Sequence, residues 1–174
     1  KAIAQLKLAA RLQPNDTQTH QKLIECYDKQ KDREGAVGQL IESLELSRRN
    51  IELRRDLGRR YADLGRPKEA ERAYTSIVEV LPSESESHAM LAEVRQEQNR
   101  WEGAVAHWRR VAEIRALEPT GLVKLAEALV HLKRWDDAEA TLKRLRARSW
   151  PERFRDVAGQ VRKLERQMEQ QRNK

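Results

Sequence analysis

The chain has 174 residues, of which 36% are charged and 39% are hydrophobic, and its formal net charge at pH 7 is +7. This balance suits an elongated molecule with a thin core, and no segment approaches the roughly 18 consecutive apolar residues of a membrane span. The single cysteine, Cys26, excludes an intrachain disulfide and a multi-cysteine metal site.

Residues 1–16 carry one helical pattern. Ala2, Leu6, Ala9 and Leu12 are apolar or small positions of an amphipathic helix, and Pro14 follows them. These positions are in register with the 34-residue repeat described below. The register predicts that this segment is the second helix of a pair whose first helix is not in this chain. We therefore expect a fragment of a longer protein. Because no charged-then-apolar leader opens it, we expect a soluble protein, with the cytoplasm favoured although the compartment is not declared.

Residues 17–149 repeat one pattern every 34 residues. An invariant leucine column contains Leu23, Leu57, Leu91 and Leu125, and an invariant alanine column contains Ala36, Ala70, Ala104 and Ala138. A third column is always large and apolar (Leu40, Tyr74, Trp108, Leu142), and a fourth is small in three of its four members (Ile24, Gly58, Ala92, Ala126). This period predicts four units, over residues 17–50, 51–84, 85–118 and 119–149.

The unit at residues 51–84 shows the physics of one repeat. Apolar residues from Ile51 to Leu64 fall at helical spacing, and Gly65 can adopt the left-handed backbone that ends a helix. Pro67 is suited to the first turn of a second helix, and Pro82 ends it. Neither helix is apolar enough to be stable alone, so we expect each pair to stack on its neighbours.

The segment "RRDLGRRYADLGRPKEAERAYTSIVEVLP" resembles the tetratricopeptide repeat. The residues that carry the resemblance are Leu57, Gly58, Tyr61, Gly65, Ala70, Tyr74 and Pro82. The neighbouring units match less fully, with Ile24 at a usually small position and Lys31 where glycine is usual. The resemblance implies an all-α fold, a right-handed α-solenoid of antiparallel helix pairs that forms one domain.

Residues 150–174 do not continue the repeat. Ser149 and Glu152 predict a capping box around Pro151, followed by a helix. Its apolar stripe comprises Phe154, Val157, Val161, Leu164 and Met168. We interpret this helix as a C-terminal cap over the last repeat, and a short dimer contact along the stripe is the competing interpretation.

The positive charge is concentrated at the C-terminal end. Lys143–Lys174 contains 11 basic and 4 acidic residues, so the whole formal excess of +7 lies there. The basic side chains that could form a positively charged surface are Arg144, Arg146, Arg148, Arg153, Arg155, Arg162 and Lys163. A solvated face is the simpler interpretation, and binding of nucleic acid or another polyanion is an alternative with less support, because stacking aromatics are few.

The sequence contains no recognisable catalytic or metal-binding motif. The four histidines lack zinc-site spacing, and the chain has neither a GxSxG motif nor a phosphate-binding glycine loop. His20 and His88 share one repeat column with Arg54 and Leu122, so we expect a shared packing or rim role. We therefore predict no enzyme activity, no cofactor and no metal.

The resemblance implies that the first helices line a concave groove that binds a peptide segment or a partner helix. Carried over by column, the partner-binding residues are Lys22, Glu25, Lys29, Arg55, Arg59, Met90, Glu93, Glu97, Lys124, Glu127 and His131. Chaperone-binding members of the family clamp a partner's terminal carboxylate with lysines, asparagines and an arginine. That set of residues is absent here, because Glu25 replaces an expected asparagine and Asp56 and Met90 occupy other positions of the clamp. A partner with separated charges and apolar anchors fits better.

Self-assembly is a further alternative. The N-terminal helix, with Ile3 and Leu6 expected to be exposed, could stack against another copy, as could the C-terminal helix.

Overall fold

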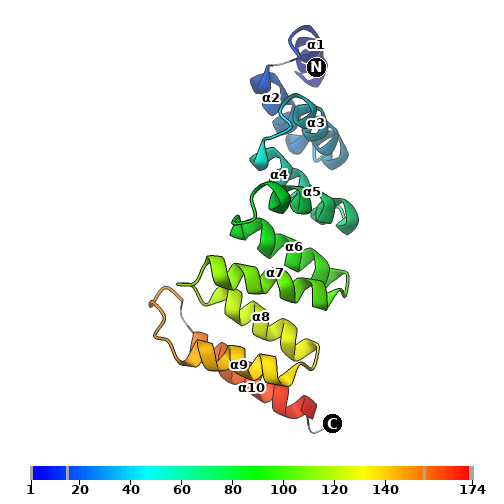
Figure 1. Cartoon of the computed structure of the whole chain (residues 1–174). Coiled ribbons are helices and arrows are strands. Elements are labelled where there is room, and N and C mark those ends of the chain that lie inside the picture. The colour runs from blue at the N-terminus through cyan, green and yellow to red at the C-terminus, as the bar shows by residue number, and fades with distance from the viewer. Residues whose placement is uncertain (1, 15, 155, 173–174) are drawn as a thin grey trace. The chain divides into compact units, whose positions relative to one another are not determined.

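The computed structural model describes residues 2–14, 16–154 and 156–172, and these residues form ten α-helices and no strand. The helices are α1 (Ala2–Leu12), α2 (Thr17–Lys29), α3 (Arg33–Leu46), α4 (Ile51–Asp63), α5 (Pro67–Val80), α6 (Ser85–Glu97), α7 (Trp101–Ile114), α8 (Thr120–His131), α9 (Trp135–Arg146) and α10 (Val157–Arg172). Short turns join α2 to α3, α4 to α5, α6 to α7 and α8 to α9 (Figure 1). The chain is therefore an all-α protein built from helical hairpins, as the sequence predicts.

The helix boundaries follow local chemistry. The side chain of Asn50 caps α4 by accepting a hydrogen bond from the backbone N–H of Leu53 at 3.1 Å. Gly65 has φ +67°, which confirms the predicted left-handed turn, and Pro67 begins α5. The same column has positive φ in every repeat, at Lys31, Asn99 and Lys133. The turn geometry is thus repeated even where the residue is not glycine.

The chain divides into two compact units, Lys1–Ile77 and Val78–Lys174. The first unit has one hydrophobic cluster, centred on Leu23, Ala36, Leu40 and Leu57. The second unit has two clusters, one around Trp108 and Leu129 and the other around Leu142, Val161 and Leu164. All four alanines of the invariant column are fully buried, as expected of small residues between paired helices.

The small column and the large column are complementary in size. A Cβ at Gly58 would lie 2.5 Å from Cε1 of Tyr74, so the absence of a side chain on α4 makes room for the ring on α5. Ala92 and Trp108 share a cluster in the second unit, where a small residue again accompanies a large aromatic. In the first unit the larger Ile24 accompanies the smaller Leu40. The unusual isoleucine thus shares its cluster with a smaller member of the large column.

The helix α10 packs against α8 and α9 (Figure 1). Val157, Val161, Leu164 and Met168 are buried, as the apolar stripe predicts, so a dimer contact through α10 would need another face of this helix. The predicted capping box at Ser149 and Glu152 is wrong because α10 begins only at Val157.

A turn takes the place of the expected first helical turn. The backbone N–H of Phe154 donates to the carbonyl oxygen of Pro151 at 2.9 Å, and Asp156 has φ +70°. This geometry keeps Phe154 outside the helix, although its ring is partly buried against the neighbouring cluster.

The helix α1 has no buried residue. Ile3 and Leu6 are partly covered because they pack against the cluster of the first unit. The expectation that these two are exposed is therefore wrong, and the exposed apolar side chains of α1 are Leu8 and Leu12, at 59% and 75% of their full accessible surface.

Candidate functional site

The first helices of the first unit, α2 and α4, carry five of the predicted partner-binding residues. Lys22, Glu25 and Lys29 on α2 are exposed, and so is Arg59 on α4. Arg55 differs, because only 12% of its side chain is exposed and it forms an ion pair with Glu52. Arg59 is therefore better placed than Arg55 to meet a partner.

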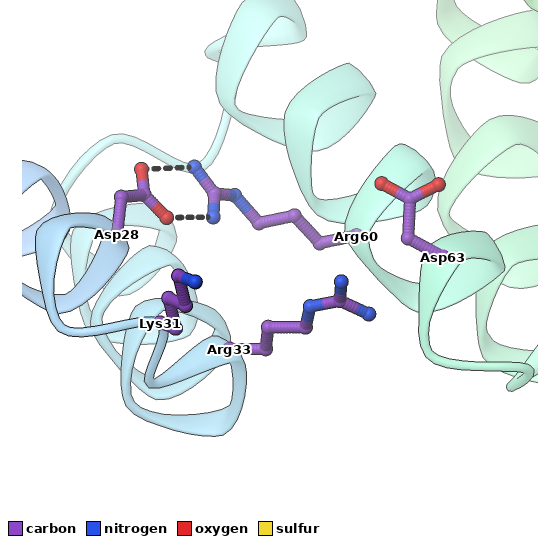
Figure 2. A pocket seen from close by; sticks show the side chains of 5 residues that line it. All are labelled: Asp28, Lys31, Arg33, Arg60 and Asp63. Atoms are coloured by element: carbon purple, nitrogen blue, oxygen red, sulfur yellow. Dashed lines mark hydrogen bonds and ion pairs between the residues drawn. The ribbon is translucent and has the colours of Figure 1, made fainter.

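A charged hollow of about 710 Å³ lies where α2 ends, α3 begins and α4 ends. Figure 2 shows Lys31 and Arg33 on the α3 side of this hollow and Arg60 and Asp63 on α4. Arg60 donates two hydrogen bonds to Asp28, at 2.6 and 2.9 Å, drawn as dashed lines in Figure 2. The hollow is thus built around a bidentate ion pair between successive first helices.

The ion pair alters both ionisable groups. Hydrogen bonding from Arg60 holds the pKa of Asp28 below its ordinary value, and hydrogen bonding to Asp28 raises the pKa of Arg60. Asp56 adds a further contact, because its Oδ2 accepts from Nε of Arg60 at 3.0 Å. Since two carboxylates already engage this guanidinium, its main role is to join helices, and Lys31 and Arg33 are the more available cations.

The first helices of the second unit, α6 and α8, carry the other six predicted residues. Glu93 and Glu97 on α6 are exposed, while Met90 is partly covered. Lys124 and Glu127 on α8 form an ion pair at 2.9 Å, and about 40% of each side chain remains exposed. Although Glu93 is exposed as a residue, partial desolvation of its carboxyl group by neighbouring atoms raises its pKa; Lys124 opposes this shift and Glu97 adds to it. The structure therefore brings the predicted acidic residues and Lys124 into one electrostatic neighbourhood.

His131, the last predicted residue of α8, lies at the end of its helix. Its ring stacks on Trp101 of α7, with 3.7 Å between ring centroids and 22° between the planes. The histidine is nevertheless exposed, so the stack leaves part of the ring accessible. A packing contact thus fixes the orientation of a side chain that a partner can still reach.

One feature that the sequence did not predict is a cavity of about 360 Å³ beside α8. It is lined by the predicted residues Lys124 and Glu127 and also by Val123, Arg153 and Phe154. Phe154 is the only phenylalanine of the chain, and it lies in the segment before α10. The sequence did offer one signal for this cavity, an aromatic side chain close to the start of the last helix. The helical spacing of the apolar stripe instead led us to place Phe154 within that helix.

The shared histidine column has a structural role. His20 and His88 are hydrogen-bonded through Nε2 to the carbonyl oxygens of Pro14 and Pro82, at 2.9 and 3.1 Å. In the same column, Arg54 donates to the carbonyl oxygen of Arg48. Each side chain therefore binds the backbone six residues earlier, where the preceding helix has ended, which fits the expected rim role.

His88 also belongs to a chain of hydrogen bonds. Its Nδ1 lies 2.9 Å from Nδ1 of His107, and Nε2 of His107 lies 2.8 Å from a guanidinium nitrogen of Arg95. Arg95 occupies the repeat column that contains Tyr27 and Tyr61 in the preceding repeats. The network therefore supplies hydrogen-bond partners for the Arg95 side chain between α6 and α7.

The described part of the chain contains neither a candidate metal-binding group nor a helix that could span a membrane. No three His, Cys, Asp or Glu side chains are grouped there as a metal site would require. None of the helices over the described ranges combines the length and the apolar character needed to cross a bilayer. Arg155, one of the expected basic surface residues, lies outside the described residues.

A family model described as tetratricopeptide repeat matches residues 55–119 and 89–153, which together span more than half of the chain. The chain belongs to the tetratricopeptide repeat family. Its helical hairpins accordingly place it among the α-solenoid folds. A search of curated proteins gives no match.

Solved structures show the same fold at low sequence identity. A tetratricopeptide repeat protein from Parabacteroides merdae is 17% identical, with a TM-score of 0.70 over 95% of this chain and 65% of that chain. MamA from Desulfovibrio magneticus RS-1 is 17% identical, with a TM-score of 0.64 over 94% of this chain and 84% of that one. YrrB, described as a tetratricopeptide repeat protein with an unusual peptide-binding site, is 16% identical, with a TM-score of 0.65 over 81% and 73%.

Proposed function

We propose that this chain is a non-catalytic protein-protein interaction scaffold that binds a peptide segment or a partner helix on the exposed faces of the first helices within its units. One observation carries the proposal: all eleven predicted residues of α2, α4, α6 and α8 keep at least part of their surface accessible, while the leucine column of the same helices (Leu23, Leu57, Leu91, Leu125) is buried. These side chains are not needed to fill the core, so a partner can contact the surface that they leave accessible.

The chemistry of the faces favours a partner with separated charges. In the first unit, Lys22, Lys29 and Arg59 offer cations, with Glu25 among them. In the second unit, Glu93 and Glu97 offer carboxylates. Burial opposes the charged form of Glu93, so a partner cation placed there would gain more than at a fully solvated carboxylate.

The cavity beside α8 supports an apolar anchor. Val123 is buried and Phe154 is partly covered, and both lie next to the charged pair of Lys124 and Glu127. A partner side chain that entered this cavity would bury apolar surface while its flanking charges met the pair. The description of YrrB as having a peptide-binding site, and the generally non-catalytic character of the family, are consistent with this proposal.

The test compares two charge reversals within one repeat. Arg59→Glu alters the exposed face of α4, and Arg72→Glu makes the same charge change on α5, where Arg72 is also exposed. We expect proteins captured from the native source by the intact chain to be retained by Arg72→Glu and lost with Arg59→Glu. Arg55 is unsuitable for this test because reversing a largely covered charge would disturb the fold.

The outcomes separate the proposal from its alternatives. Retention of every captured protein by Arg59→Glu would exclude recognition at this position of α4. Capture dominated by nucleic acid, and lost at moderate salt, would favour the polyanion alternative. A molecular mass that rises with concentration, without a captured partner, would favour the self-assembling structural protein.

A further inference from the structure

A second cavity, of about 260 Å³, lies between the end of α9, the segment that follows it and the first half of α10. Its floor is apolar and is formed by Leu145, Trp150, Val157 and Val161. Leu145 and Val161 are at most 3% exposed, so their positions are held by the core of the second unit. The cavity therefore has a firm floor with room for one large apolar side chain.

The indole of Trp150 is fixed in this wall. Its Nε1 donates to the carbonyl oxygen of Leu145 at 2.9 Å, which anchors the loop to the last turn of α9. The guanidinium of Arg148 lies 5.5 Å from the centre of the same ring. Arg148 also donates to the carbonyl oxygen of Ala116, so its charged group is held beside the cavity.

The remaining lining is strongly cationic. Arg146, Arg148 and Arg162 contribute three guanidinium groups, and Glu165 contributes one carboxylate. Arg146 and Glu165 form an ion pair at 2.8 Å. Among the described residues, the ion pairs leave Arg148 and Arg162 without a carboxylate partner. The uncompensated charge beside the apolar floor is therefore positive.

We propose that this cavity is a docking site for an acidic peptide segment that carries one large apolar anchor. The anchor lies on Leu145, Val157 and Val161, and carboxylates on either side of it pair with Arg148 and Arg162. Charge complementarity selects the occupant, because guanidinium groups bind carboxylates with directed hydrogen bonds. A nucleic acid fits less well, since Arg148 is held beside the Trp150 ring and the other floor residues are aliphatic, which leaves no open stacking platform.

The experiment measures fluorescence anisotropy of a short labelled peptide in which a single Leu is flanked on both sides by Glu. At about 0.15 M salt we expect the intact chain to bind it with a Kd below about 1 mM. Arg162→Glu should weaken binding at least about tenfold. The matched control Arg166→Glu, an equal charge change on the same helix outside the cavity, should change Kd less than about threefold.

A second variant and a second peptide keep the test independent of folding. Ala158 is exposed and lines the cavity, so Ala158→Glu should repel the peptide without disturbing the core. Replacing the Leu of the peptide by Ser should weaken binding at least about tenfold. Arg72→Glu, a charge reversal on α5 outside this cavity, should leave Kd unchanged. The capture experiment with Arg59→Glu tests the proposed function separately, so the two failures are distinguishable.

Three results would overturn the inference. The first is no binding of the acidic peptide up to about 1 mM. The second is an equal loss of affinity with Arg162→Glu and Arg166→Glu, or indifference to the Leu, because either would indicate general charge attraction. The third is tighter binding of a single-stranded oligonucleotide with the same dependence on Arg162, which would indicate a nucleic-acid site.

Discussion

Single residues set how closely paired helices pack in this chain. Gly58 shows this most directly, because a Cβ at this position would lie 2.5 Å from one ring carbon of Tyr74 and 2.7 Å from another. Tyr74 is only 2% exposed, so its ring cannot swing into solvent without leaving the core. A glycine that would ordinarily weaken a helix is thus required here by packing.

Replacing Gly58 by Ala should therefore destabilise the protein, although alanine has the higher helix propensity. We expect the free energy of unfolding to fall by about 1–3 kcal/mol, the usual range for overpacking a core. Thermal or denaturant unfolding measures this change. The cost should shrink in a Tyr74→Leu background, because the smaller side chain, as at Leu40, leaves room for the methyl group.

Gly38 provides the matched control. It lies inside α3, is exposed, and an added Cβ would have no atom within 4 Å. Gly38→Ala should stabilise the protein by about 0.5–1 kcal/mol through helix propensity alone. If Gly58→Ala stabilised by a similar amount, the packing explanation of the small column would be wrong.

The repeat columns of the sequence predict which residues are buried, but they do not predict which side chains pack against each other. Periodicity alone identifies the buried leucines and alanines, because side chains on one helix face recur at fixed intervals. It cannot show that Gly58 makes room for Tyr74, because that match depends on two residues from different helices. The coverage of Arg55 was unpredictable for the same reason, since a column fixes a helix face but not the conformation of a long side chain.

At the scale of helices, ion pairs recur between successive repeats. Arg66 pairs with Glu34 at 3.3 Å, and Arg134 pairs with Glu102 at 3.1 Å, in the same two columns. Arg60 and Asp28 form a closer pair between α4 and α2. These partly exposed contacts contribute little each, but they favour one register between neighbouring helices.

The pair of Asp28 and Arg60 makes a pH-dependent contribution to stability. Hydrogen bonding from Arg60 lowers the pKa of Asp28, so the folded protein holds this proton less tightly than the unfolded chain, whose value is about 3.9. The stabilisation is complete above that value and is lost as the pH falls through the lower folded value. Because 45% of the Asp28 side chain is exposed, screening keeps the effect below about 1 kcal/mol.

Arg60→Gln should therefore raise the pKa of Asp28 towards its ordinary value, which carboxyl NMR titration measures directly. The difference in unfolding free energy between intact chain and variant should be present at neutral pH and should shrink as the pH falls below about 4. Arg72→Gln, on an exposed position of α5, is the control and should leave the Asp28 titration unchanged. An unaltered pKa in Arg60→Gln would show that another group lowers it.

Helix ends were less predictable than helix faces. The turn at Gly65 and the start at Pro67 followed from residues with strong backbone preferences. The start of α10 did not, because Ser149 and Glu152 match a capping pattern that the backbone does not use. The helix begins after a turn from Pro151 to Phe154, where the partly buried ring packs on the cluster below it. Tertiary packing outweighed the local signal.

For the whole molecule, burial is distributed very unevenly among the helices. No residue of α1 is buried, whereas α8 has eight buried residues and contributes to both clusters of the second unit. A helix that buries little apolar surface opens at low free-energy cost, because few contacts oppose its gain in conformational entropy. The chain should therefore lack a uniform stability.

Amide hydrogen exchange followed by mass spectrometry should reveal this gradient, with α1 exchanging fastest and α8 slowest among the helices. Comparable protection in α1 and α8 would contradict the burial argument.

Repeating the exchange measurement at a tenfold higher protein concentration, a mass-action shift of about 1.4 kcal/mol, tests for self-association. If a second copy covers Leu8 and Leu12, protection of α1 should rise with concentration while that of α8 stays constant. Concentration-independent exchange in α1 would instead leave partner recognition by the first helices as the better supported role.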